Sequence, residues 1–76
     1  MEEMTTIFYD READVLYITI GEPQVAISQE LGNDVLLRVH PETGKVVGMT
    51  MLNFMSRFSN LAKEQPLPVH MELHAA

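Results

Sequence analysis

The sequence predicts an α+β fold: an antiparallel β-meander of four or five strands with one helix, from the C-terminal half, packed on one face of the sheet. Three observations predict it. Short runs rich in β-branched and aromatic residues recur through residues 5–52, turn-forming residues separate them, and one stretch with helical spacing follows. We expect residues 1–76 to form a single small domain.

The first two strands are expected at residues 5–9 and 15–20, which are rich in β-branched and aromatic side chains. Between them lies a polar turn in which the carboxylates of Asp10 and Asp14 can accept hydrogen bonds from nearby backbone amides. We interpret both aspartates as structural. Pro23 breaks the chain after the second strand, because proline lacks the amide donor that a central strand needs. A third, more polar strand is then expected at 25–31.

Residues 35–40 and 45–52 predict a hairpin, because the loop between them begins with proline and ends with glycine. The expected cross-strand pairs are His40 with Lys45, Val39 with Val46, Leu37 with Gly48, and Leu36 with Met49. Alternation then predicts two apolar faces. One carries Val35, Leu37, Val39, Val46 and Leu52, and the other carries Leu36, Val47, Met49 and Met51.

The helix is expected behind Asn53, a plausible N-cap, and should run for about three turns until the proline-rich segment 66–68. Its apolar positions recur at helical spacing and are Phe54, Phe58, Leu61 and Ala62. Beyond the prolines, apolar and polar residues alternate through 69–73, which predicts a final strand.

Size and composition favour self-association. A chain of 76 residues buries little apolar surface, and without cysteine it can use neither disulfides nor cysteine-based zinc sites to compensate. The net charge is −6, residues 1–34 hold eight acidic residues against one arginine, and no basic cluster follows, so nucleic acid is not an expected partner. No apolar run approaches the ~20 residues that span a bilayer, and the acidic start is unlike a signal peptide. We expect a cytoplasmic protein that does not bind membranes.

Three sets of residues are candidates for chemical sites. Asp10, Glu12 and Asp14 have the spacing of early calcium-loop ligands, but the glycine and glutamate of such a loop are missing further on. His70, Glu72 and His74 are acceptable ligand types for zinc or nickel, yet residues two apart on a strand lie nearly 7 Å apart. The hydroxyls of Ser28, Ser56 and Ser59 lack a sequence context that presents a nucleophile. We predict no catalytic residue, no metal site and no cofactor.

One helix can cover only one face of the predicted hairpin. The other face, formed by Leu36, Val47, Met49 and Met51, would remain exposed, and large exposed apolar patches commonly mark an interface. This predicts a homodimer with these four residues at the interface. The stiff segment 66–68 could also direct residues 69–73 onto the sheet edge of the second copy.

Part of the chain resembles the small bacterial domain-of-unknown-function family 2283. The resemblance spans residues 7–52 and is carried by Tyr9-Asp10, Glu12-Ala13-Asp14, Leu16-Tyr17-Ile18, Val35-Leu36-Leu37, Gly44, Val46-Val47-Gly48 and Leu52. Members tend to be acidic where this chain has Arg38, His40 and Thr50. The resemblance implies an antiparallel β domain with a helix and no established activity. Because some members are encoded beside small toxin-like proteins, it also implies an antitoxin-like role as one alternative.

These observations together predict a non-catalytic interaction module that self-associates. Two alternatives remain open: the antitoxin-like partner of a small toxin-like protein, and a small metal- or ligand-binding protein that uses the C-terminal histidines.

Overall fold

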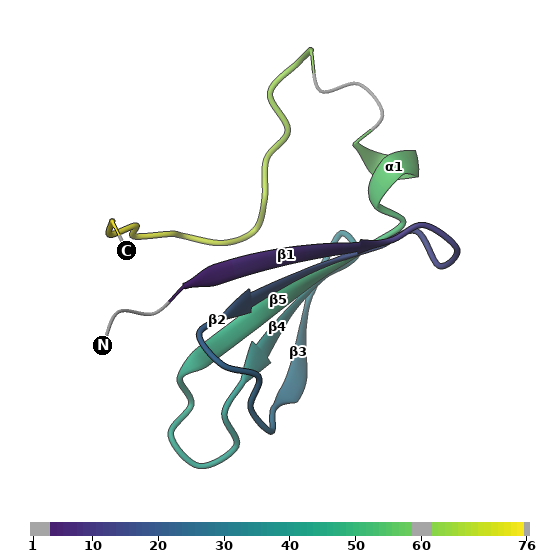
Figure 1. Ribbon diagram of the computed structural model, residues 1–76. Coiled ribbons are helices and arrows are strands. Elements are labelled where there is room, and N and C mark those ends of the chain that lie inside the picture. The colour runs from purple at the N-terminus through teal and green to yellow at the C-terminus, as the bar shows by residue number, and fades with distance from the viewer. Residues whose placement is uncertain (1–3, 59–61, 76) are drawn as a thin grey trace.

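The computed structural model describes residues 4–58 and 62–75 and shows a five-stranded antiparallel sheet with one helical turn beside it (Figure 1). The strands are β1 (Thr5–Asp10), β2 (Val15–Ile20), β3 (Ile27–Gly32), β4 (Val35–Val39) and β5 (Val46–Leu52), and the helix is α1 (Phe54–Arg57). The antiparallel sheet is confirmed, with five strands. The α+β class holds only coarsely, because α1 is four residues long.

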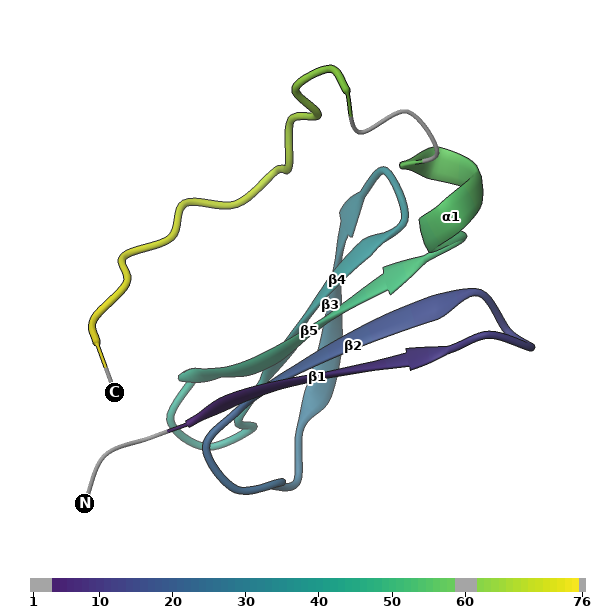
Figure 2. The ribbon, with the colours of Figure 1, turned by 45° about the horizontal axis from the view of Figure 1, so that its top comes forward.

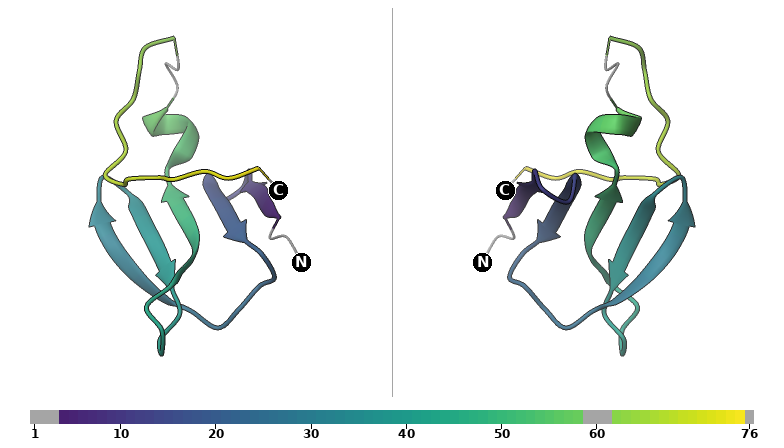
Figure 3. Two further views of the ribbon diagram at one scale, coloured as in Figure 1. Left: turned by 90° about the vertical axis from the view of Figure 1, so that its left-hand side faces the viewer. Right: turned by 90° about the vertical axis from the view of Figure 1, so that its right-hand side faces the viewer.

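The strand order is β1-β2-β5-β4-β3, so the predicted meander is wrong. In a meander β3 would pair with β2, but here β5 takes that position and pairs with β2 on one side and β4 on the other. The connection at 21–26 therefore carries the chain past the ends of β5 and β4 to the far edge (Figure 3). The burial of the strands agrees with this order, since the central strand β5 has the most buried residues of any strand and the edge strand β3 is largely exposed.

The β4–β5 hairpin begins in the predicted register and then departs from it. The His40 amide donates to the Lys45 carbonyl at 2.8 Å, as expected for that pair. Val39 pairs with Val46, but Arg38 then pairs with Gly48, so the residue between them on β5, Val47, is the extra residue of a β-bulge.

The bulge corrects the predicted faces of the hairpin. Leu37 lies opposite Met49 instead of Gly48, Leu36 lies opposite Thr50, and Val35 lies opposite Met51. A one-residue shift moves every later side chain to the other face. The core face of the sheet therefore carries Leu16, Ile18, Val35, Leu37, Met49 and Met51, and the opposite face carries Phe8, Tyr17, Leu36 and Thr50.

The core lies where α1 and the later chain meet the core face. Val35, Met49, Met51 and Phe58 form its buried centre, and half-buried residues such as Leu16 and Phe54 pack around it. The predicted helix of three turns is wrong for the described residues, because only Phe54–Arg57 are helical and Ala62 lies in a turn. The predicted apolar position Leu61 lies outside the described residues.

Residues 62–75 form an extended segment, the C-terminal tail, which crosses the core face from the β3 side to the β1 side (Figures 2 and 3). The strand predicted at 69–73 is wrong, since these residues do not join the sheet. Leu67 and Val69 nevertheless pack against the core. No helix in the described part of the chain is long and apolar enough to cross a membrane.

Candidate interaction surface

The outer side of β1 is an open sheet edge. Within residues 4–58 and 62–75 no strand lies beyond it. The Gly21 amide donates to the Met4 carbonyl at 2.8 Å, and the β1–β2 register runs without interruption from there. Because hydrogen-bonded and non-hydrogen-bonded pairs alternate in an antiparallel ladder, Thr5, Ile7 and Tyr9 direct their backbone N–H and C=O groups outward.

Large apolar side chains stand on both faces of this edge. Ile7 is 71% exposed on the core face, and Phe8 is 65% exposed on the opposite face. The Phe8 ring stacks on that of Tyr17 at 6.2 Å between centroids, which fixes its position on the sheet. Proteins usually blunt an edge strand with lysine, proline or a bulge. β1 has none of these, and its one charged residue, Asp10, stands at its end.

The other edge of the sheet, β3, is built differently. Leu31 is the extra residue of a bulge, because Glu30 pairs with Leu36 while Gly32 pairs with Val35. The strand also carries a charged residue, Glu30, at a central exposed position. Its exposed apolar residue is Ile27, 58% exposed at the strand's first position. Bulge and charge protect β3 in the usual way and leave β1 as the unprotected edge.

The two aspartates that were predicted to organise the β1–β2 turn have different roles. The Asp10 carboxylate accepts hydrogen bonds from the amides of Glu12 and Ala13 at 3.1 and 3.2 Å, which confirms a turn-forming role. Asp14 does not bond within the turn. It has a left-handed backbone with φ of 57°, which aspartate tolerates better than most residues, and it reaches a distant part of the chain.

Asp14 caps the helix that begins 40 residues later. Its backbone carbonyl accepts the Phe54 amide at 3.0 Å, and its carboxylate accepts the Met55 amide at 2.8 Å and the Ser56 amide at 3.4 Å. These are the amides that a helix start leaves without partners. Asn53 does stand at the predicted N-cap position, and its carbonyl accepts the Arg57 amide at 2.9 Å, but its backbone is left-handed and its side chain makes no cap bond.

The same carboxylate holds the end of β1. The Tyr9 hydroxyl donates to Asp14 Oδ1 at 2.6 Å, and this bond lowers the pKa of the Asp14 carboxyl, with the Met55 amide acting in the same direction. The bond also raises the pKa of the Tyr9 phenol, because the hydroxyl must keep its proton to donate it. The Tyr9 ring lies 5.9 Å from that of Phe54, so the edge strand and α1 are joined by both polar and apolar contacts.

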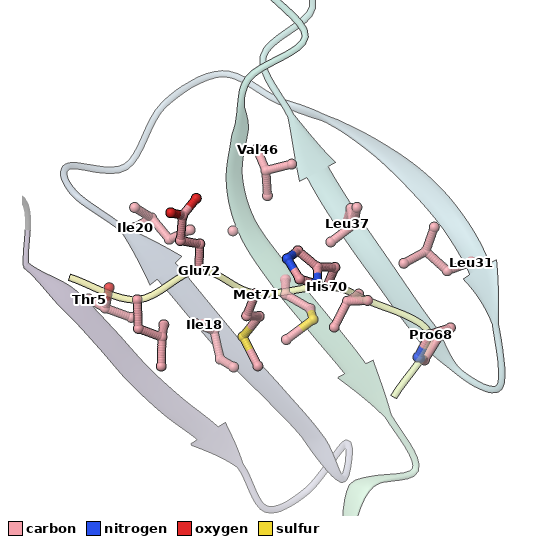
Figure 4. A pocket seen from close by; sticks show the side chains of 14 residues that line it. Thr5, Ile18, Ile20, Leu31, Leu37, Val46, Pro68, His70, Met71 and Glu72 are labelled. Atoms are coloured by element: carbon pink, nitrogen blue, oxygen red, sulfur yellow. The ribbon is translucent and has the colours of Figure 1, made fainter. Parts of the chain in front are cut away.

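A groove of about 480 Å³ lies between the core face and the C-terminal tail (Figure 4). Sheet residues such as Ile18, Leu37 and Met49 form its floor, and Val69 and Met71 of the tail form its roof. Thr5 of β1 also lines the groove, so the groove extends to the open edge of the sheet. The last tail residues are poorly covered, with Met71 57% and Leu73 83% exposed. The apolar core face is therefore only partly covered by its own chain.

The C-terminal histidines do not converge on a common point. His74 Nε2 lies 4.0 Å from Glu72 Oε1, and both side chains are more than four-fifths exposed. His70 lines the groove near Glu72. Across the described residues no three histidine, aspartate or glutamate side chains are grouped to hold a metal ion. The turn residues Asp10, Glu12 and Asp14, which the structure describes, are not grouped in this way either.

Of the three serines considered as nucleophiles, Ser56 has the clearest partner. Its hydroxyl donates to Asp14 Oδ2 at 3.3 Å, beside the capping bonds of α1. Ser28 lies exposed on the edge strand β3, opposite Arg38. Ser59 lies outside the described residues.

The predicted interface residues do not form one exposed patch. Met49 and Met51 lie on the core face and are only 7% and 6% exposed, and Val47, at the bulge, is 6% exposed. Leu36 lies on the opposite face. The residues that sequence reasoning missed are Ile7 and Phe8, although adjacent apolar residues in a strand must point to opposite faces.

A model of the family described as Protein of unknown function (DUF2283) matches residues 6–54 of the chain. This range begins in β1 and ends at the first residue of α1. It thus contains β1 from its second residue onward, the β1–β2 turn and the central strand β5, but not the C-terminal tail. No curated protein and no solved structure matches the chain.

Proposed function

This chain belongs to the DUF2283 family of proteins of unknown function, and on that premise we propose that it is a non-catalytic interaction module that self-associates into a homodimer. The observation that carries the proposal is the open edge of β1. Its backbone groups point outward, and an apolar side chain stands on each face of the edge: Ile7 on the core face and Phe8 on the opposite face. Each of these side chains is about two thirds exposed.

Covering this edge would stabilise the molecule in two ways. Pairing the outward amides and carbonyls with a second strand replaces water as their partner, and burying Ile7 and Phe8 removes apolar area from solvent at roughly 25 cal/mol per Å². A small chain gains proportionally more from such burial than a large one. Rigid placement also helps, because Tyr9 and Phe8 are held by Asp14 and Tyr17 and lose little freedom on binding.

The non-catalytic part of the proposal rests on the groups that surround the groove and α1. The groove is bounded chiefly by aliphatic and methionine side chains. The Ser56 hydroxyl donates to the Asp14 carboxylate, which also accepts the Met55 amide at the helix start, so both groups already have structural roles.

The mass of the protein in solution tests the proposal. Sedimentation at micromolar concentration should give one species of twice the 8.6 kDa chain mass. Ile7→Lys should shift the protein toward monomer, because a lysine on the edge strand carries its charge into the contact.

Ile27→Lys is the matched control, since Ile27 is also an exposed isoleucine on an edge strand. It should leave the dimer unchanged. Circular dichroism melting should show both variants folded, because both side chains are mostly exposed. A wild-type species of 8.6 kDa that stays monomeric as concentration rises would overturn the proposal.

A further inference from the structure

We propose that two copies pair β1 with β1 in antiparallel orientation about a two-fold axis at Ile7, which joins their sheets into one continuous sheet of ten strands. This inference rests on the proposed self-association and assigns its geometry. Its basis is the set of backbone groups that β1 leaves free.

Only one register uses every outward group of β1. Thr5, Ile7 and Tyr9 point outward, so a partner strand in the ladder must present the same three residues. With the axis at Ile7, Thr5 lies opposite Tyr9 of the partner subunit and Ile7 lies opposite Ile7 of the partner subunit. All three positions then form hydrogen-bonded pairs, giving about six backbone bonds. A shift of two residues in either direction loses one of these pairs within the strand.

The side chains agree with this register. On the core face the two Ile7 side chains meet at the axis, and each is 71% exposed in the single chain. On the opposite face Phe8 lies across from Thr6 of the partner subunit, and the two phenylalanines stand diagonally, within reach for aromatic side chains. Asp10 lies across from Met4 of the partner subunit, so the charged residue of the strand does not meet its own copy.

Pairing β1 with β3 of a second copy fits less well. The bulge at Leu31 interrupts the ladder, and Glu30 stands at the centre of the strand. Such a contact would also be head-to-tail and would leave a free β1 and a free β3 at the two ends, so it would continue into a filament. The two-fold pairing uses the unprotected β1 edge of both copies, so the assembly is a closed dimer.

The two-fold assembly also gives the C-terminal tail more sheet to cover. The tail reaches the open edge beside Thr5, where Leu73 is 83% exposed (Figure 4). A second sheet beside β1 continues the core face past this edge. The groove of one copy and that of its partner then lie on the same side of a single sheet, since an axis perpendicular to a sheet keeps both copies on one face.

Single cysteines test the register directly, because the natural chain has none. Under mild oxidation Ile7→Cys should form a disulfide-linked dimer at least roughly tenfold faster than Thr5→Cys, because equivalent Cα atoms at the axis lie within disulfide reach. The two copies of residue 5 are displaced by four positions, about 13 Å along the strand. Melting should show that both variants are folded.

A mixture of two variants gives an independent measurement. Thr6→Cys and Phe8→Cys should cross-link to each other when mixed, since residues 6 and 8 lie directly opposite in this register, and each should cross-link poorly alone. Strongest linking at position 6 or 8 alone would overturn the register. A dimer in sedimentation with no linking anywhere in β1 would overturn this inference and leave self-association standing. A monomer would overturn both.

Discussion

Asp14 joins the end of β1 and the turn after it to the start of α1, which follows about 40 residues later in the sequence. Its side chain accepts from the Tyr9 hydroxyl at the end of β1 and from the amides of Met55 and Ser56 at the start of α1. Asp34 has a similar place at the β3–β4 turn: its backbone is left-handed, and its carboxylate accepts from Asn53 and Arg57 at 3.4 and 3.3 Å. Two turns of the sheet therefore hold the short helix in position.

The lowered pKa of Asp14 predicts a contribution to the pH dependence of stability. A carboxyl whose pKa is lower in the folded state stabilises the fold above its unfolded pKa of about 3.9, and this stabilisation is lost as pH falls through the folded pKa. Asp14→Asn should therefore lower the melting temperature at pH 7, and its difference from wild type should shrink below about pH 4. Asp34→Asn, which changes the carboxylate at the other turn that holds the helix, is the variant for comparison. A constant difference from pH 7 to pH 2 would contradict the role of the charge.

The phenol of Tyr9 gives a second test of the same bond. The chain has two tyrosines, so in a Tyr17→Phe background the ultraviolet absorbance reports Tyr9 alone. Its pKa should lie above the usual value of about 10. Adding Asp14→Asn should lower this pKa toward the usual value, because the largest cause of the raised pKa is the hydrogen bond to the Asp14 carboxylate. No change on adding Asp14→Asn would mean that another contact holds the phenol.

Residue roles could be predicted where they are local and not where they depend on tertiary contacts. The turn bonds of Asp10 reach only residues 12 and 13, and the motif indicates them. The two helix amides that donate to Asp14 lie 41 and 42 residues away, so no local pattern connects them to it. The left-handed backbone of Asn53 likewise depends on how the chain leaves β5, although its sequence context is typical of an N-cap.

Among the elements, β5 is packed most tightly. A Cβ atom built on Gly48 would lie 2.7 Å from the backbone carbonyl oxygen of Ile18 on β2, which cannot move without displacing a strand. The sequence predicts that Gly48 pairs with Leu37, but its neighbours on the two sides are Thr19 and Arg38. The close approach is to backbone, and therefore any side chain at this position is unfavourable.

Gly48→Ala should lower the free energy of unfolding by about 1–3 kcal/mol, the usual range for overpacking in a well-packed site. Chemical denaturation at fixed protein concentration measures it. Gly44→Asn is a suitable control: Gly44 has φ of 74° and nothing within 4 Å of its Cβ position, and asparagine tolerates that backbone better than most residues. A neutral Gly48→Ala would mean that β2 and β5 can separate at little cost.

The strands themselves were predictable, but their arrangement was not. Alternation and turn residues are local signals, and they located all five strands to within two residues. Strand order depends on which edges bury most surface, and the bulge at Val47 depends on β2 and β4 together. The helix was overestimated because Phe54 and Phe58 fit a helical spacing, but a single turn and the bend after it already bring their rings to 5.3 Å between centroids.

At the scale of the whole molecule, the C-terminal tail replaces the second layer that a longer helix would have formed. Leu67 and Val69 pack against the core. Removing residues 66–76 should therefore lower the free energy of unfolding by roughly 1–3 kcal/mol and increase binding of a hydrophobic dye, because two half-buried apolar side chains are lost. Removing only residues 74–76 is the control and should change neither quantity. Unchanged stability after the longer truncation would show that the tail contributes no cover.

The position of β5 also affects how the protein is made on the ribosome. The hairpins β1–β2 and β3–β4 can each form soon after their residues emerge, but neither pairs with the other. The strand that joins them is the last of the five to be synthesised. At about 5–20 residues per second, several seconds separate the end of β2 from the end of β5. During that interval β2, and β4 once it has been synthesised, present the inner edges that β5 will later occupy, and a chain arrested before residue 46 cannot complete the sheet.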